Sequence, residues 1–455
     1  MTNTNNEKVV VRFPPSPTGP LHIGNVRTAL YNYLFARQNN GKFLLRIEDT
    51  DKERSKKEFE DDILNSLKWL SLEYNGDVLK SSERLDIYKE KINDLIKTGR
   101  AYIAEEQNID KEARPTEQSF GRVVRFKNPG GKIKFTDLIR GEVEMEVGDL
   151  EDFIIAKNIN EPIYHLAVVV DDMASSITHI IRGEDHISNT PRQILIWEAL
   201  GGTRPIYAHL PLILAEDKSK LSKRKHGEVV SLDYYHKQGY LPEAIINFLA
   251  LIGWNPGTDQ EIFSIKDLIE KFDLSKVQKG GAVFNQEKLD WVNKEHIKML
   301  SEEVRNKNIL ERLNKCGIGE KVSEKVYPLI FDRISKWSDI DIMVGAGELD
   351  YYFTSPIYET SLLLWKGESQ DEAKKHLELV VQTIKNSSEE EFSSVEKVKN
   401  LIFDYATNNG RGQVLWPIRV ALSGREKSPD PFTLLYILGK EESFNRINNA
   451  IKKLS

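Results

Sequence analysis

The first fifty residues carry an apolar pattern that predicts a strand, a helix and a second strand. The apolar run 9–13 has the length of a short buried strand, and the proline- and glycine-containing stretch 14–20 ends it. From Val26 onward apolar residues recur at helical spacing until Gly41, and 43–47 returns to a strand pattern. Strand, glycine-containing turn, helix and strand in this order indicate the opening of a parallel, doubly wound α/β sheet.

The next two hundred residues continue this pattern with one interruption. Short strand-like runs and the turn Pro129-Gly130-Gly131 break the rhythm between 102 and 162, which indicates a small inserted α+β module. A helix is predicted to begin at Thr190-Pro191, with proline at its first position. The remaining predictions are helices over 59–70 and 85–96, strands in the module at 122–126 and 141–147, and sheet strands at 164–170, 177–181 and 206–214.

Beyond residue 227 the spacing of apolar residues becomes mostly helical, and lysine- and glutamate-rich amphipathic segments dominate after about 300. The fold class is therefore α/β: a Rossmann-type parallel catalytic sheet with an inserted module, followed by a mostly α-helical C-terminal region. We expect a catalytic domain in two halves, 1–101 and 163–226, with the inserted module at 102–162 between them. A connecting domain at 227–300 and the helical region at 301–455 follow.

Composition narrows the class of protein. A chain of 455 residues is too long for a single core. It contains no apolar run long enough to span a membrane, and its polar N-terminus lacks a signal core. The single cysteine, Cys316, excludes an internal disulfide and a cysteine-cluster zinc site, which fits a cytoplasmic location. With a net charge of −6, any contact with RNA must come from local basic patches.

The first chemical motif, 12–25, lies between the first strand and the first helix, at the sheet edge where ligands bind in open α/β folds. The amides of a helix N-terminus favour anionic groups. His22 could donate to a phosphate, and Gly24 leaves space for a flat adenine against the backbone. Taken alone, the segment could also be a proline-rich turn with an ordinary surface histidine, which is the simpler interpretation of His22.

The second motif is the basic loop 218–227, which follows the last predicted strand of the sheet. Its lysines could reach the phosphates of a nucleotide and neutralise charge as pyrophosphate leaves. Alone, it could also be a solvated run of charge or a nonspecific nucleic-acid patch.

Together, these motifs resemble the two signatures of class I aminoacyl-tRNA synthetases in the form used by the glutamyl branch. The segment 15–25 resembles the HIGH signature, and Lys220-Leu221-Ser222-Lys223-Arg224 resembles the KMSKS loop. Other segments resemble that branch in the same order and at compatible spacing: 46–51, 164–167, 169–172, 181–186 and 413–439. The resemblance spans nearly the whole chain.

The resemblance implies a role for each matching residue. Arg12 and Ser16 would hold the amino acid, Glu48 would receive its ammonium group, and Tyr164 and Arg182 would form the side-chain pocket, with Arg182 gripping a γ-carboxylate by two hydrogen bonds. His22, Lys220 and Lys223 would be catalytic. The implied ATP contacts are Pro15, Thr18, Gly19, His22, Gly24, Asn25, Leu221, Ser222, Lys223 and Arg224.

The residues also allow structural alternatives. Arg182 could form an ion pair with Glu184 or Asp185, and Glu48 could form a salt bridge at a strand end. We expect Asp49, Asp51, Asp171 and Asp172 to be turn or capping carboxylates rather than catalytic groups.

The chain departs from the family pattern at three points. Asn25 replaces the last histidine of the first signature, and Val168 replaces an asparagine that contacts substrate in some relatives. The inserted module is shorter than in many relatives and lacks their zinc-binding cysteines, so no structural zinc is expected.

The implied activity is ATP-dependent ligation of glutamate to tRNA(Glu) through glutamyl-adenylate, with Mg²⁺ bound to ATP. We expect a monomer whose helical region reads the anticodon. Alternatives are an enzyme that also charges tRNA(Gln), a glutaminyl-tRNA synthetase, another nucleotidyltransferase, an enzyme that glutamylates a tRNA base, and a non-catalytic tRNA-binding paralogue.

Overall fold

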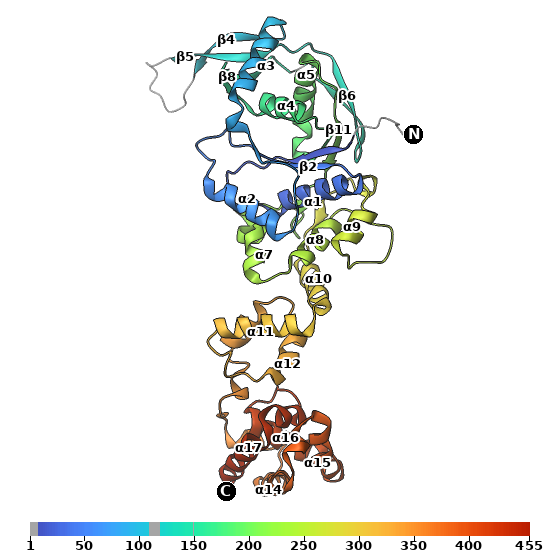
Figure 1. The fold of residues 1–455 in the computed structure, drawn as a ribbon. Coiled ribbons are helices and arrows are strands. Elements are labelled where there is room, and N and C mark those ends of the chain that lie inside the picture. The colour runs from blue at the N-terminus through green and yellow to red at the C-terminus, as the bar shows by residue number, and fades with distance from the viewer. Residues whose placement is uncertain (1–7, 109–118, 149) are drawn as a thin grey trace. The chain divides into compact units, whose positions relative to one another are not determined.

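The computed structural model describes residues 8–108, 119–148 and 150–455. The chain divides into two compact units, Met1–Ile297 and Lys298–Ser455, each with its own elements (Figure 1). No helix of the described residues is long and apolar enough to cross a membrane.

The first unit opens with the predicted strand, helix and strand. Strands β1 (Val10–Phe13), β2 (Lys42–Ile47) and β3 (Leu79–Lys80) pair in parallel in that order. Helix α1 (Ile23–Gln38) connects β1 to β2 and packs on both. Helices α2 (Lys57–Trp69) and α3 (Leu85–Lys97) confirm the two helices predicted next.

The second part of the catalytic sheet contains strands from both sides of the module. Its order is β10 (His179–Gly183), β11 (Ile206–Leu210), β6 (Lys132–Asp137) and β7 (Gly141–Glu146). Strands β10, β11 and β6 run parallel, and β7 is antiparallel. The amide of Thr178 donates to the carbonyl of Val10 at 2.9 Å, which places β10 beside β1. Neighbouring side chains of β1 enter different cores, since Val11 packs with α1 and Val10 packs against the core of α4 and α5.

The segment 102–162 is shared between two sheets. Strands β6 and β7 join the catalytic sheet, whereas the others form a separate antiparallel sheet with the order β4 (Ala101–Asn108), β5 (Ser119–Phe126), β8 (Phe153–Asn158) and β9 (Glu161–Pro162). The strand predictions at 122–126 and 141–147 are therefore confirmed, but the second strand serves the catalytic sheet. This arrangement pairs Asp137, the last residue of β6, with Tyr207 of β11.

Two of the strand predictions are wrong in detail. The run 164–170 is the helix α4 (Tyr164–Ala174), not a strand. Residues 166–172 are all buried, so the helix has no polar face and its apolar run shows no helical period. The expected strand 206–214 is divided at Pro211 into β11 and β12 (Ile213–Leu214), because proline cannot donate to a sheet ladder.

Short helices complete the first unit. The predicted helix at Thr190-Pro191 is α5 (Thr190–Ala199), and the apolar stripe after 240 lies on α8 (Pro242–Leu251), which packs on α1. The others are α6 (Lys223–His226), α7 (Leu232–Gln238), α9 (Ile265–Lys271) and α10 (Gln286–Met299); the short strand β13 (Ala282–Val283) pairs with β12.

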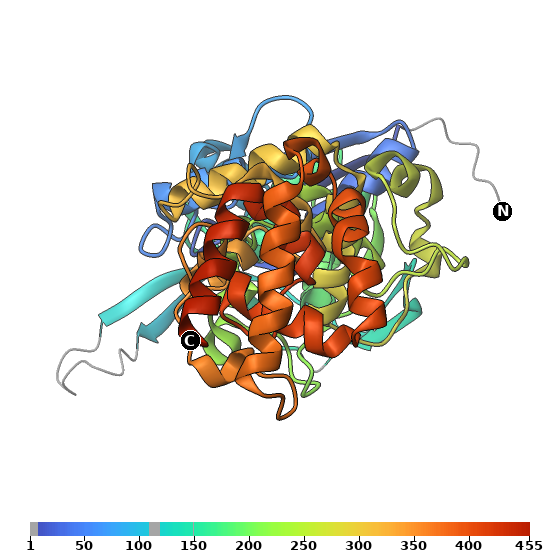
Figure 2. The same cartoon turned by 90° about the horizontal axis from the view of Figure 1, so that it is seen from below.

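The second unit is built from helices, as predicted. Helix α11 (Glu302–Lys315) packs against α12 (Tyr327–Arg333) and α13 (Asp339–Gly345). The final bundle surrounds a single apolar core, and Figure 2 shows its helices packed side by side. Its members are α14 (Gln370–Asn386), α15 (Val395–Asn408), α16 (Arg411–Ser423) and α17 (Pro431–Lys453), the last interrupted at Gly439.

Candidate active site

A cavity of about 420 Å³ lies at the carboxyl ends of β1, β2 and β10, where parallel α/β sheets place their ligands. Both sequence motifs line it. The lining residues are Arg12, Phe13, Pro14, Pro15, Ser16, Thr18, His22, Gly24, Asn25, Arg27, Thr28, Glu48, Tyr164, Arg182, Gly183, Asp185, His186, Pro211, Leu212, Ile213, Lys220 and Leu221. Segments that are about 200 residues apart in the sequence therefore share one cavity.

His22 caps the first helix and contacts the second motif. Its Nδ1 accepts a hydrogen bond from the amide of Gly24 at 2.9 Å. Burial lowers the pKa of His22 to about 4, although a hydrogen bond to the backbone of Leu221 opposes the shift. The ring is therefore neutral near pH 7. Because Nδ1 is the acceptor, the ring proton lies on Nε2, which is the donor that faces the backbone of Leu221.

The basic loop is held against the cavity by short contacts. The amide of Leu221 donates to the carbonyl of Ile213 at 3.1 Å, and Lys220 forms a 3.0 Å ion pair with Asp185. Lys225 binds Asp217, away from the cavity lining. Helix α6 begins at Lys223, whose side chain lies outside the described part of the structure. The loop thus presents at least one lysine, Lys220, to the cavity.

Arg182, the residue before the end of β10, is a buried cation without a carboxylate partner among the described residues. Its side chain is only 5% exposed, and burial lowers the pKa of its guanidinium. All of its partners are neutral. They are His209 Nε2 at 3.1 Å from Nε, Gln193 Oε1 at 2.7 Å from Nη1, and Thr190 Oγ1 at 2.8 Å and the His186 carbonyl at 3.3 Å from Nη2. The expected alternative, an ion pair with Glu184 or Asp185, is absent from the described contacts: Glu184 binds Arg140, and Asp185 binds Lys220.

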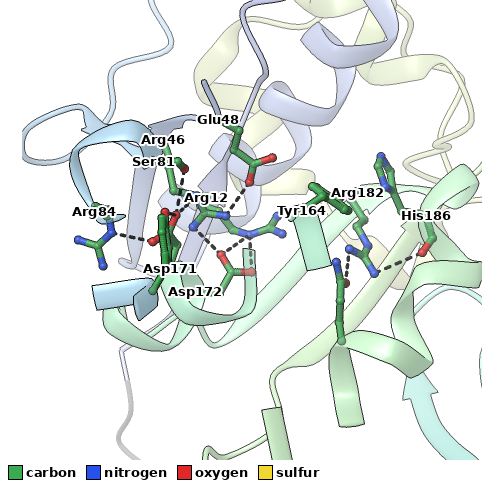
Figure 3. Close-up of polar contacts among 12 residues, drawn as sticks. Arg12, Arg46, Glu48, Ser81, Arg84, Tyr164, Asp171, Asp172, Arg182 and His186 are labelled. Atoms are coloured by element: carbon green, nitrogen blue, oxygen red, sulfur yellow. Dashed lines mark hydrogen bonds and ion pairs between the residues drawn. The ribbon is translucent and has the colours of Figure 1, made fainter. Parts of the chain in front are cut away.

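A second arginine, Arg12 of β1, also lines the cavity, and a buried carboxylate holds its guanidinium group. Its Nε lies 3.1 Å from Oδ1 of Asp172, and its Nη1 is buried with no partner among the described residues (Figure 3). Asp172 also binds Arg46 Nη1 at 2.7 Å, and Arg46 Nη2 binds Glu48 at 3.0 Å. The Glu48 interaction is the expected strand-end salt bridge. Burial raises the pKa of Glu48, whereas Arg46 opposes the shift.

Asp171 and Asp172 correct our expectation of turn or capping carboxylates. Both are buried on α4, where their carboxylates face the guanidinium groups of Arg12, Arg46 and Arg84 (Figure 3). Asp171 binds Arg84 at 2.6 Å and accepts from the hydroxyl of Tyr88 at 2.7 Å. The error follows from the wrong strand prediction for 164–170, since the helix turns these carboxylates into the protein. Asp49, by contrast, accepts from the amide of Ser82 at 2.8 Å, as a capping residue does.

The cavity brings together most of the candidate residues. Ser16 and Thr18 are exposed at its rim, and Tyr164 is in contact with His186, with 3.3 Å between its hydroxyl and Nδ1. Among the candidate residues that the structure describes in full, those that do not line the cavity are Gly19, Ser222 and Arg224. The cavity has no cluster of three or more potential metal ligands within the described residues.

Several residues around the cavity were not found from the sequence. Arg27 is buried and donates from Nη1 to the carbonyl of Ile252 at 3.3 Å, and His186 contacts Tyr164. Asp137 and His209 support Arg182 from behind, although they are 72 residues apart in the chain. His186 ends the matching segment 181–186 but was given no role, whereas Arg27, Asp137 and His209 belong to no such segment and are revealed only by the fold.

Comparison with family models covers both units. Residues 8–113 and 105–291 match the catalytic domain of class I tRNA synthetases (E and Q), and 289–451 match an anticodon binding domain.

Individual relatives match over nearly their whole length. The chain is 40% identical to the glutamate–tRNA ligase of Aquifex aeolicus, with 98% of this chain and all of the relative covered. It is also 40% identical to the enzyme of Carboxydothermus hydrogenoformans, with 97% and 99% covered. A crystal structure of a glutamate tRNA ligase from Elizabethkingia meningosepticum, in complex with its amino acid, superposes with a TM-score of 0.87 at 34% identity and covers 99% of this chain and all of that one.

Proposed function

This chain belongs to the class I tRNA synthetases for glutamate and glutamine, and we propose on that basis that it is a glutamate–tRNA ligase that charges tRNA(Glu). ATP use follows from the class. The observation that carries the choice of amino acid is Arg182, a buried cation at the cavity wall with only neutral partners among the described residues.

Arg182 favours glutamate over glutamine for an electrostatic reason. A carboxylate would supply the missing counter-charge and could accept two parallel hydrogen bonds from a guanidinium. The neutral amide of glutamine would leave the buried charge uncompensated. A site built around polar contacts can reject the wrong substrate by about 10⁴–10⁵-fold.

The other end of the amino acid would lie near Arg12 and Glu48. The unpartnered Nη1 of Arg12 is a donor for a carboxylate of the substrate, and Ser16 supplies a hydroxyl beside it. Glu48 keeps one carboxylate oxygen that makes none of the described hydrogen bonds, and this oxygen would receive the ammonium group. Tyr164 lines the same cavity as Arg12 and Arg182 and would close the pocket between them.

ATP would occupy the side of the cavity formed by the two motifs. The neutral His22 would donate from Nε2 to a phosphate in place of the Leu221 backbone, while Gly24 and Asn25 leave the backbone open beside the adenine. A side chain at position 24 would have its Cβ only 3.1 Å from Nδ1 of His22 and would disturb this cap. Pro15, Thr18 and Gly19 form the turn beneath the nucleotide. The loop residues Lys220, Leu221, Ser222, Lys223 and Arg224 close over the leaving phosphates.

The chemistry needs no nucleophile from the enzyme. An oxygen of the glutamate α-carboxylate attacks the α-phosphorus of ATP, and the bond to pyrophosphate breaks. A ribose hydroxyl of the terminal adenosine of tRNA then attacks the activated carbonyl, and AMP leaves. The chain aligns the reactants and stabilises negative charge in flight. Mg²⁺ enters with ATP, bound to its phosphates.

The second unit supplies the contact with the anticodon. It matches an anticodon binding domain, and its described elements are helical. A glutaminyl-tRNA synthetase would be expected to have a β-barrel in this region. RNA loops are read by stacking on aromatic rings and by arginine contacts. We propose a monomer that discriminates tRNA(Glu) by this unit; charging of tRNA(Gln) as well is the second candidate.

Pyrophosphate exchange into ATP tests the proposal. We expect glutamate-dependent exchange in the presence of tRNA(Glu), and transfer of glutamate to that tRNA. Exchange driven by glutamine instead would contradict the role of Arg182. Parallel charging of purified tRNA(Gln) decides between a discriminating and a non-discriminating enzyme.

A further inference from the structure

The buried pair Asp137–His209 stands directly behind the arginine that is proposed to select the substrate. His209 follows Ala208 in β11, and Asp137 is the last residue of β6. Both side chains are fully buried, and neither lines the cavity. The pair therefore does not touch the substrate, and its effect must pass through Arg182.

The hydrogen bonds fix the tautomer of His209. Oδ2 of Asp137 lies 2.6 Å from Nδ1 of His209 and 3.0 Å from its backbone nitrogen. A carboxylate can only accept, so Nδ1 carries the proton. Nε2 then has a free lone pair, and it accepts from Nε of Arg182 at 3.1 Å. The opposite tautomer would place two N–H groups against each other at this point.

The charge states support the same assignment. Burial lowers the pKa of His209, so the ring is neutral near pH 7. Burial opposes ionisation of Asp137, but hydrogen bonds from His209 and from the amides of Arg140 and Ile139 lower its pKa overall. Asp137 is thus an anion, His209 a neutral relay and Arg182 a cation, in a row of three.

The hydrogen bonds around Arg182 fix the orientation of its guanidinium group. Nε carries a single N–H, and His209 accepts it. Gln193 and Thr190 hold one N–H of each terminal nitrogen. One N–H of Nη1 makes none of the described hydrogen bonds, and the 3.3 Å contact of Nη2 with the His186 carbonyl is long. A ligand carboxylate would therefore meet an arginine already fixed in plane.

We propose that Asp137 and His209 are positioning residues that hold the Arg182 guanidinium in the orientation needed to recognise the side-chain carboxylate of the substrate. This inference rests on the proposed function. Its basis is the continuous set of hydrogen bonds from the end of β6, through β11, to the cavity wall at β10. Recognition of the amino acid side chain thus depends on the carboxylate of Asp137, which acts on Arg182 through His209.

Two substitutions at His209 separate the relay from simple packing. The amide of asparagine reaches about as far as Nδ1, whereas the amide of glutamine reaches Nε2. His209→Asn therefore keeps a donor for Asp137 and removes the acceptor for Arg182, while His209→Gln keeps an acceptor for Arg182. The neighbouring variant Tyr207→Phe is the matched control, since the Tyr207 hydroxyl is buried without a partner among the described residues.

The readout is the KM for glutamate and for ATP in pyrophosphate exchange with tRNA(Glu) present. For His209→Asn we expect the KM for glutamate to rise about tenfold or more, with the KM for ATP changed less than about twofold, and the preference for glutamate over glutamine to fall about tenfold. His209→Gln should recover most of this loss, and Tyr207→Phe should match the wild type.

Asp137→Asn gives an independent test if the His209 variants do not fold. Oδ1 accepts from two amides, those of Ile139 and Arg140, each at 2.9 Å, and Oδ2 accepts from His209. An asparagine must therefore turn its NH₂ group against a donor in either orientation, and we expect the same selective rise in the KM for glutamate. Equal changes in both KM values, or none, would overturn the positioning role. A wild-type enzyme inactive with glutamate would instead overturn the proposed function.

Discussion

Asp172 anchors Arg12 to the buried floor of the cavity: its Oδ1 lies 3.1 Å from Nε of Arg12, and the two side chains are 0% and 3% exposed. The same oxygen binds Arg46 at 2.7 Å, so one carboxylate balances two buried guanidinium groups. The charge of Asp172 therefore supports both the stability of the first unit and the position of a substrate-facing arginine.

Replacing Asp172 with asparagine should destabilise the fold strongly. The change leaves Arg12 and Arg46 without their main counter-charge, and breaking a buried pair from one side costs about 3–5 kcal/mol. We expect a matching loss in the free energy of unfolding, measured by urea denaturation. Asp51→Asn is the control, because its pair with Arg54 lies on the surface. A loss no larger than in this control would contradict the account.

Lys223→Ala should slow formation of the adenylate far more than it weakens glutamate binding. The reason is its place in the loop that resembles a phosphate-contacting signature and ends at the cavity. The measurement is single-turnover adenylate formation at saturating glutamate, and a fall of about 100-fold is expected. Lys225→Ala is the matched control, because Lys225 binds Asp217 away from the lining. Equal rates in the two variants would count against the loop's role.

Stability should fall as the pH decreases from about 6.5 towards 4. Burial lowers the pKa of His22, His165, His179 and His186 from 6.5 to about 4 each. Between these values the unfolded chain binds more protons than the folded chain, so acid favours unfolding; above pH 6.5 the contribution is fully present. Thermal unfolding from pH 7.5 to 5 measures this.

A histidine away from the cavity provides the control for this pH dependence. His179 packs against Phe35, and burial is the only cause of its shift. His179→Gln should reduce the dependence of stability on pH by the share of one group while leaving the KM values unchanged. A Tm that stays constant between pH 7.5 and 5 in the wild type would be incompatible with four half-buried histidines of lowered pKa.

A chain ending at Leu300 should keep its substrate site and lose tRNA charging. The first unit contains its own cores, and α10 ends at Met299. We expect ATP and glutamate to bind to the shortened chain, because all cavity residues lie before position 222. Charging of tRNA(Glu) should fall by orders of magnitude without the anticodon contact. Unchanged charging kinetics would exclude the role assigned to the second unit.

The sequence was sufficient to predict those parts of the structure that depend on a local pattern of residues. The opening strand, helix and strand followed from apolar spacing, and the match of 15–25 and 220–224 to two signatures correctly implied one shared cavity. Helix α4 was missed because it is buried on nearly all sides and therefore shows no amphipathic period. The two aspartates that it carries were consequently expected to be turn or capping carboxylates.

Contacts between distant parts of the chain could not be predicted. Asp137 lies in a segment that reads as an inserted module, yet β6 is a strand of the catalytic sheet beside β11. Its bond to His209 arises from that pairing alone. The partner set of Arg182 was hidden for the same reason, because Gln193 and Thr190 lie on α5 and meet the arginine only in the folded state.

The central claim is that Arg182 selects a carboxylate side chain, and kcat/KM for glutamate in tRNA(Glu) charging tests it most directly. We predict that Arg182→Gln lowers this value at least about 100-fold while the KM for ATP stays within about twofold, since charge-assisted hydrogen bonds to the substrate are lost. Arg204→Gln, which removes a surface arginine paired with Glu198, should leave both values unchanged. An Arg182→Gln enzyme that charges glutamate as efficiently as the wild type would contradict the account.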